Sequence, residues 1–230
     1  FAVGAGQNIV GRTKNCNYPV EVTEIRDIGS LFPPDYELIL AQRPQLIFMS
    51  DGNLRVRERL EALKIPVFVI RPRTLEDIGT TMDTLGMIMG TTAQAQPAAE
   101  HFRTQLRALK SASPQGLTVM YEVWPKPLTV PGQKTFIADI IRIAGGQNLV
   151  ESGAEDWPRI SMEWAVSQNP DVILTNTSTR RDRWLVGGVP GWAQTNAIRK
   201  RQVFVVPNED AFVRPGPRVL EAVCWLKSKL

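Results

Sequence analysis

Histidine and cysteine, on which many enzymes and metalloproteins depend, are scarce in this sequence. Its 230 residues include one histidine and two cysteines. A three-histidine zinc site cannot be built from one histidine, and two cysteines do not make a disulfide framework. A bond between Cys16 and Cys224 stays open, although we expect Cys16 to be a buried, inert thiol. His101 lies in a predicted helix, where a surface or packing role is the simpler interpretation.

Sequence signatures of nucleotide binding and of nucleophilic catalysis are also missing. The chain has no Gly-x-Ser-x-Gly pattern and no Walker-type loop. Gly4, Gly6 and Gly11 have the wrong spacing for a dinucleotide-binding loop, so we interpret them as a turn that closes a helix. These absences argue against an enzyme, and we predict neither catalytic residues nor a metal site.

Long apolar runs are absent as well. No run approaches the roughly 18 residues of a membrane span, and no basic-then-apolar leader begins the chain. Residues 1–4 resemble the end of a helix, so a signal segment or lipid anchor upstream stays open. The net charge is +4, with basic clusters at 180–183 and 199–201. Because neither cluster contains interleaved aromatic residues, we expect solvated surfaces and no nucleic-acid partner.

What the sequence does contain is an alternation of short apolar runs with helical patterns. Such alternation predicts an α/β protein with mainly parallel sheets flanked by helices. The predicted strands are 45–49, 67–70, 117–121, 172–174 and 203–206, and the clearest helices are 53–63 and 136–144. The second helix is closed by Gly145-Gly146.

One segment departs from this rhythm and suggests two lobes. Residues 74–112 are helical without a strand, with interruptions near Gly90 and Pro97, which indicates a rigid connector. We therefore predict an N-terminal α/β lobe at 1–93, one long connecting helix at 94–112 and a C-terminal α/β lobe at 113–230.

A weak internal repeat supports the two lobes. Residues 37–47 resemble 163–173: in both, a glutamate opens a short helix, a proline follows seven residues later, and a strand begins at once. The helix dipole favours an acidic residue near a helix N-terminus, which accounts for Glu37 and Glu163 singly but not for their matched positions. In the second copy we expect Ser161 to be the N-cap and Trp164 to lie in the core.

Aromatic and polar residues stand in the connections after strands or before helices. Proline follows Tyr18, Trp124 and Trp157 directly and fixes the backbone beside each ring. Open α/β sheets bind ligands at the carboxyl ends of their strands, and aromatic walls with few polar groups suit a bulky, largely neutral organic ligand. The predicted ligand-binding residues are Tyr18, Met49, Ser50, Trp124, Trp157, Asp210, Phe212 and Arg214.

Five segments, in their order and spacing, carry a family resemblance that spans nearly the whole chain. They are 10–19, 37–47, 145–148, 157–173 and 214–218. With them the chain resembles the helical-backbone (class III) superfamily of periplasmic substrate-binding proteins and, within it, the cobalamin-binding proteins of ABC importers.

The resemblance implies that a corrinoid is held between two lobes as transported ligand, with no catalytic cofactor. Tyr18 and Trp157 match ligand-contacting positions of the family, Trp124 matches one approximately, and Asp210 and Arg214 match polar contacts. Glu37 and Glu163 match the glutamates that dock onto arginines of the permease dimer. The resemblance further implies a monomer in the periplasm or elsewhere outside the cytoplasm.

The chain also departs from the family pattern. Tryptophans expected near Leu31-Phe32 and near Met49-Ser50 are absent, and Ala144 stands where some relatives have a cysteine, so their disulfide is not carried over. The family's opening strand has no counterpart, and we expect a trimmed domain.

Three alternatives stay open. The same fold could carry a ferric siderophore or haem, with Arg214 and Arg218 as cations. The chain could also be a chelatase-like enzyme or a sensor lobe without a transport role.

Overall fold

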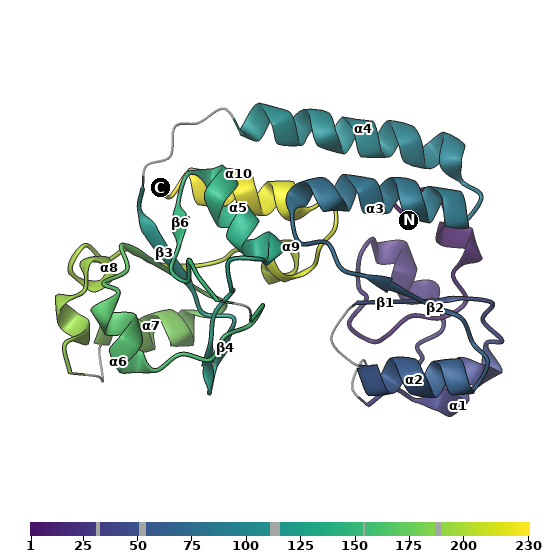
Figure 1. Cartoon of the computed structure of the whole chain (residues 1–230), viewed down its shortest axis with the longest axis horizontal. Coiled ribbons are helices and arrows are strands. Elements are labelled where there is room, and N and C mark those ends of the chain that lie inside the picture. Colours follow the sequence, from purple (N-terminus) through teal and green to yellow (C-terminus); the bar gives the residue numbers. More distant parts are fainter. Residues whose placement is uncertain (31–32, 51–53, 111–115, 154, 187–189) are drawn as a thin grey trace. The chain divides into compact units, whose positions relative to one another are not determined.

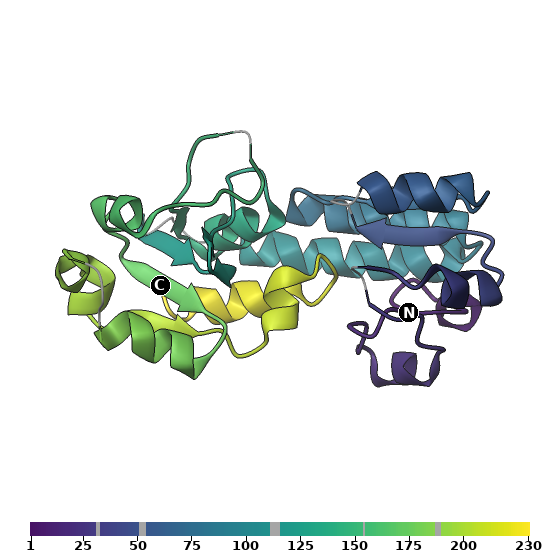
Figure 2. The same cartoon turned by 90° about the horizontal axis from the view of Figure 1, so that it is seen from below.

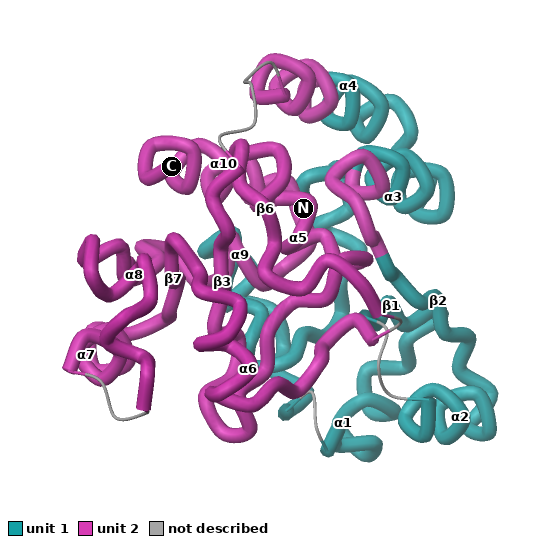
Figure 3. The backbone as a smooth tube through the Cα atoms, turned by 60° about the vertical axis from the view of Figure 1, so that its left-hand side comes forward, with its two compact units in different colours: residues 1–71, 79–100 teal, residues 72–78, 101–230 magenta. Residues whose placement is uncertain are grey.

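The computed structural model describes residues 1–230 except 31–32, 51–53, 111–115, 154 and 187–189, and it divides into two compact units (Figures 1 and 3). Unit 1 comprises residues 1–71 and 79–100, and unit 2 comprises residues 72–78 and 101–230.

The segment 74–112, predicted to be helical without a strand, contains a pair of helices. Helix α3 spans Leu75–Ile88 and helix α4 spans Thr92–Leu109, so α4 corresponds to the predicted connecting helix. The predicted interruption at Gly90 is confirmed, since this residue has a left-handed backbone, with φ of 68°, in the turn between the helices. The predicted interruption at Pro97 is wrong, because Pro97 lies inside α4. Residues 111 and 112 of the predicted connector lie outside the described part.

Unit 1 is built on two parallel strands. Strand β1 (Ile47–Ser50) pairs with β2 (Val67–Ile70) along its whole length. Ile39, Leu60 and Ile65 form a small buried cluster to which both flanking helices contribute. The helical elements of this unit, besides parts of α3 and α4, are η1 (Gly6–Asn8), η2 (Val20–Glu24), α1 (Tyr36–Ala41) and α2 (Leu54–Ala62).

Unit 2 contains a parallel sheet of four strands in the order β6-β3-β7-β8. Its strands are β3 (Thr118–Tyr121), β6 (Gln147–Asn148), β7 (Val172–Thr175) and β8 (Val203–Val205). A separate hairpin joins β4 (Trp124–Pro125) to β5 (Leu128–Thr129). Its helices are α5 (Phe136–Ala144), α6 (Met162–Ser167), α7 (Ser178–Val186), η3 (Trp192–Gln194), α8 (Asn196–Arg199), α9 (Glu209–Val213) and α10 (Val219–Lys227).

Alternation along β3 sends neighbouring side chains into two different cores, because successive residues of a strand face opposite sides of a sheet. Met120 belongs to a buried cluster with Trp184 of α7 and Trp192 of η3. Tyr121 instead packs against Phe212 of α9, with ring centroids 5.6 Å apart. The final helix α10, yellow in Figures 1 and 2, packs against α5 and α9. The sheet of unit 2 therefore has helical cover on both faces.

The structure confirms the predicted α/β class and the predicted strands to within a few residues. Helix α5 has the predicted bounds, and its ends show why. The Thr135 hydroxyl accepts a hydrogen bond from the Ala138 N–H at 3.2 Å, and Gly145 ends the helix with a left-handed backbone. Within the described ranges, no helix is both long and apolar enough to cross a membrane.

Candidate functional site

Trp124 and Trp157 lie on a three-stranded antiparallel ribbon of unit 2. Trp124 pairs with Thr129 in the β4–β5 hairpin, and Thr129 pairs on its other side with Arg159. The Thr129–Arg159 pair is flanked by hydrogen bonds from the Val130 N–H to the Pro158 oxygen and from the Ile160 N–H to the Leu128 oxygen.

The ladder continues beyond this pair toward Trp157. The Gly132 N–H donates to the Asp156 oxygen at 2.9 Å, which places Trp157 opposite Pro131. Proline has no N–H, so Pro158 cannot supply the second bond that this register calls for. The ribbon therefore includes residues 156–160 even though only one bridge is recorded there.

The two faces of the ribbon have different surroundings. Residues directly opposite in a ladder, and every second residue along it, share a face. Trp124, Trp157 and Arg159 are therefore on one face, where the tryptophans are 59% and 44% exposed and Arg159 is also exposed. On the other face Leu128 and Val130 are buried in the core. Two indole rings thus face solvent on one side of the ribbon, while the other side packs into the core of unit 2.

The loop that carries Trp157 is held in place from two sides. A Cβ atom at Gly132 would lie 2.1 Å from the Glu155 oxygen, so only glycine permits this close approach of the two backbones. Arg73 forms an ion pair of 3.2 Å with Asp156, the residue before Trp157. The Asn148 side-chain amide donates to the Pro131 oxygen at 2.9 Å.

A buried carboxylate lies two residues before Trp124. Glu122 is fully buried, and it accepts a hydrogen bond from the Trp184 indole N–H and one from Arg183. The Arg180 side chain forms a longer ion pair with it, at 3.7 Å. Burial raises the pKa of Glu122, and these partners oppose the rise. The basic cluster 180–183, expected to be a solvated surface, lies in α7, and its Arg180 and Arg183 form ion pairs with Glu122.

Helix α9 brings one predicted ligand contact into the core. Phe212 is fully buried and packs against Tyr121 and the Trp225 ring, with the Trp225 centroid 5.7 Å away. The prediction that Phe212 contacts ligand is therefore wrong, because no part of its side chain is accessible. Asp210 and Arg214, one helical turn apart, form an ion pair of 2.8 Å on the surface of the same helix.

The remaining predicted ligand-binding residues belong to unit 1. Tyr18, 59% exposed, precedes η2 and is joined to Pro19 by a cis peptide bond. Met49 is half-buried and Ser50 is exposed at the carboxyl end of β1. Cys16, expected to be buried, is instead an exposed free thiol whose sulfur lies 3.3 Å from the Thr13 hydroxyl, and Cys224 is also free and exposed.

The internal repeat is present in three dimensions. Helices α1 and α6 both have six residues, and the side chains of Asp35 and Ser161 cap them by accepting hydrogen bonds from the third N–H. The predicted N-cap at Ser161 is thereby confirmed. Glu37 and Glu163 are each the second residue of their helix and are exposed. The Glu163 N–H and the Ser161 hydroxyl lower the pKa of Glu163. Two like-charged carboxylates therefore occupy equivalent places in the two units.

Both helices also end alike. The residue after each C-cap has a left-handed backbone, with φ of 49° at Arg43 and 47° at Asn169, and a proline follows. Trp164, next to Glu163, corrects a prediction: it is 37% exposed rather than part of the core.

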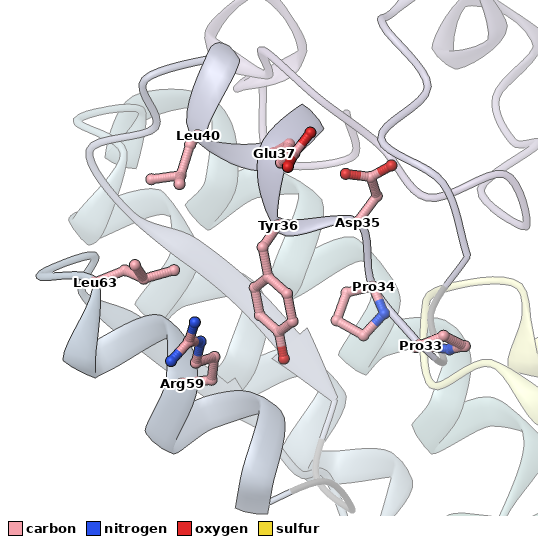
Figure 4. Close-up of a pocket in the computed structure, with 8 residues that line it drawn as sticks. All are labelled: Pro33, Pro34, Asp35, Tyr36, Glu37, Leu40, Arg59 and Leu63. Carbon is pink, nitrogen blue, oxygen red and sulfur yellow. The ribbon is translucent and has the colours of Figure 1, made fainter.

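A hollow in unit 1 lies beside Glu37 (Figure 4). Figure 4 shows the Tyr36 ring reaching toward Arg59, while the Glu37 carboxylate lies on the other side of the start of α1. The lining includes none of the predicted ligand-binding residues and consists of Pro33, Pro34, Asp35, Tyr36, Glu37, Leu40, Arg59 and Leu63. The described residues contain no group of three or more histidine, cysteine, aspartate or glutamate side chains that could hold a metal ion.

Comparison with known proteins places this geometry in a family. A family model described as "Periplasmic binding protein" matches residues 1–209. The vitamin B12-binding protein of Vibrio parahaemolyticus is 26% identical over 231 residues, which cover 97% of this chain and 82% of the relative.

Solved structures agree with the fold. The periplasmic vitamin B12 binding protein BtuF of Vibrio cholerae superposes with a TM-score of 0.87 at 25% identity, covering 99% of this chain and 90% of that one. The haem-binding protein RhuT from Roseiflexus sp. RS-1 superposes with a TM-score of 0.82 at 22% identity, covering 100% and 92%.

Proposed function

Since the chain belongs to the periplasmic binding protein family, we propose that it is the substrate-binding component of an ABC importer and that its ligand is cobalamin or a related corrinoid. The observation that carries this proposal is the pair of exposed indole rings on the ribbon of unit 2, Trp124 and Trp157. Large exposed aromatic groups with an anchored backbone suit the flat, bulky ring of a corrinoid. The similarity to two vitamin B12-binding proteins supports the same ligand.

The proposed ligand-binding residues come from both units, which we propose to act as the two lobes of the binding protein. Tyr18, Met49 and Ser50 contribute from unit 1. Trp124, Trp157, Asp210 and Arg214 contribute from unit 2. Phe212 is left out because it is buried. The Asp210–Arg214 ion pair gives this set a fixed polar element with little net charge, which fits a largely neutral ligand.

The partner proposed for Glu37 and Glu163 is the permease, with one glutamate for each permease subunit. Their matched places in α1 and α6 support this role, since a dimeric partner offers the same contact twice. The hollow beside Glu37 offers Leu40 and Leu63 to the aliphatic part of an arginine. Its two carboxylates, Asp35 and Glu37, outweigh the charge of Arg59, which also lines it. A monomer outside the cytoplasm fits this proposal.

Titration with cyanocobalamin, haem and a ferric siderophore, followed by tryptophan fluorescence, tests the ligand. We expect saturable one-to-one quenching by cyanocobalamin, because Trp124 and Trp157 would contact the ring. Quenching by the siderophore or haem alone would overturn the corrinoid proposal and leave the transport role standing. Mass spectrometry of the recovered corrinoid tests the further proposal that the protein binds without catalysis, since any chemical change would contradict it.

A haem ligand is the second candidate function. The similarity to the haem-binding protein RhuT favours it, although at 22% identity that likeness extends only to the fold. The same titration distinguishes the two ligands.

A further inference from the structure

Arg159 shares one face of the ribbon with the two exposed tryptophans. It is the partner of Thr129, which pairs with Trp124 on its other side, and it is two residues from Trp157 on the same strand. Standard ladder dimensions place its backbone about 10 Å from that of Trp124 and about 7 Å from that of Trp157. A guanidinium group at this position is within side-chain reach of any ligand that contacts both rings.

Among the residues that the structure describes, Arg159 differs from Arg73 and Arg214 in having no recorded ion pair. Arg73 is paired with Asp156, and Arg214 is paired with Asp210. In the part of the chain that the structure describes, no ion pair or side-chain hydrogen bond is recorded for Arg159. The face of the ribbon that carries Trp124 and Trp157 therefore presents the positive charge of Arg159 beside exposed aromatic surface.

We propose that Arg159 determines ligand specificity by binding an oxyanion on the periphery of the ligand whose flat ring contacts Trp124 and Trp157. The inference rests on the proposed function for the choice of ligand. Guanidinium binds phosphate and carboxylate through paired hydrogen bonds, so both the phosphodiester of cobalamin and the propionates of haem have the required chemistry. A ring ligand without an oxyanion would gain nothing from Arg159.

The experiment compares three ligands with wild-type protein, Arg159→Gln and Arg159→Lys. Cyanocobalamin has a phosphodiester, dicyanocobinamide has the corrin ring without it, and haem has two carboxylates. For the oxyanion ligand that the protein binds, we expect Arg159→Gln to weaken affinity about tenfold to a hundredfold, the range for a hydrogen bond between charged groups. Arg159→Lys should retain part of the affinity, because an ammonium cannot form the paired contact. Dicyanocobinamide affinity should be unchanged in both variants.

The matched control is Arg199→Gln, which removes an exposed arginine at the end of α8. It should bind every ligand as the wild type does, and all variants should share the wild-type Tm. The inference about Arg159 would be overturned if Arg159→Gln lost cyanocobalamin and dicyanocobinamide affinity equally, or lost none. The proposed function would still stand in that case, provided that the wild type binds cobalamin. Haem binding that depends on Arg159, without cobalamin binding, would uphold the inference and overturn the corrinoid proposal. If the wild type bound none of the three ligands, both would fail.

Discussion

Glu37 and Glu163 occupy the same position in two helices that correspond residue by residue. Each follows the first residue of a six-residue helix that begins at a side-chain cap and ends before a left-handed residue. Glutamate is the residue shared at this place, although the caps differ, with Asp35 in one unit and Ser161 in the other. Each unit therefore presents an exposed carboxylate at the same place in an equivalent helix.

The first prediction concerns these glutamates. Replacing both with alanine should abolish uptake in cells that contain the cognate permease, because each removes an exposed charge from a docking surface, while ligand affinity stays at the wild-type value. Uptake of labelled corrinoid and ligand titration measure the two effects. The control is Glu58→Ala combined with Glu151→Ala, two exposed glutamates outside the repeat. Normal uptake by the Glu37/Glu163 variant would exclude docking through these residues.

The second prediction separates exposed from buried tryptophans. Trp124→Ala and Trp157→Ala should each weaken ligand binding at least about tenfold with little change in stability, because their rings are exposed. Trp192→Ala should destabilise the protein by about 3–5 kcal/mol, because its ring is 1% exposed and packs against Trp184 with centroids 4.4 Å apart. Titrations and denaturant unfolding measure the two quantities. A large loss of stability in Trp157→Ala would show that this ring is structural.

The third prediction concerns the pH dependence of stability through Glu122. The folded-state pKa is raised, so the folded protein holds a proton on Glu122 at a pH where the unfolded chain has released it. This contribution to stability is complete below the ordinary value of 4.5 and is lost as the pH rises through the raised pKa. The stability of the wild type relative to Glu122→Gln should therefore fall as the pH rises from acid toward neutral.

Unfolding curves of the two proteins at several pH values test this expectation. A difference that grows with pH would contradict the direction of the shift. Glu122→Ala serves as the severe comparison: it should cost about 3–5 kcal/mol, because it leaves Arg180 and the Trp184 indole N–H without their buried acceptor.

The fourth prediction concerns the two thiols. Cys16 and Cys224 should both react with a disulfide reagent in the native protein, and a reductant should leave the Tm unchanged, because both are free and exposed. Counting labelled thiols by mass spectrometry measures this. A protein that labels only after reduction would contradict the free state, and Cys16→Ser and Cys224→Ser would then identify the residue involved.

The elements that the sequence predicted are those in which local pattern and tertiary packing agree. Short apolar runs became the strands β1, β2, β3, β7 and β8, and the Thr135 cap and Gly145 fixed the ends of α5. The repeat could be found in the sequence because a cap, a glutamate and a proline at fixed spacing set the start and end of a short helix locally.

The features that sequence reasoning missed depend on distant partners. The strands β4 and β5 have two residues each, too few for a period to show. Glu122 was not predicted to have a role, because its partners Arg180, Arg183 and Trp184 are distant in the sequence. Phe212 and Trp164 were misplaced because an aromatic ring in a short helix suits a core or a surface equally well.

The left-handed residues after α1 and α6 have the same backbone but different contacts in the two segments. At Arg43 the strained backbone has only a steric cost, whereas Asn169 tolerates it better and its side-chain oxygen also accepts the Asn196 N–H at 2.8 Å, which anchors the start of α8. Exchanging the residues at positions 43 and 169 would therefore have different effects in the two units. Asparagine at position 43 would ease the backbone strain there, but arginine at position 169 would leave the Asn196 N–H at the start of α8 without its side-chain acceptor. Two segments with the same backbone path therefore differ in what their left-handed residue does, since only Asn169 also contacts the next helix.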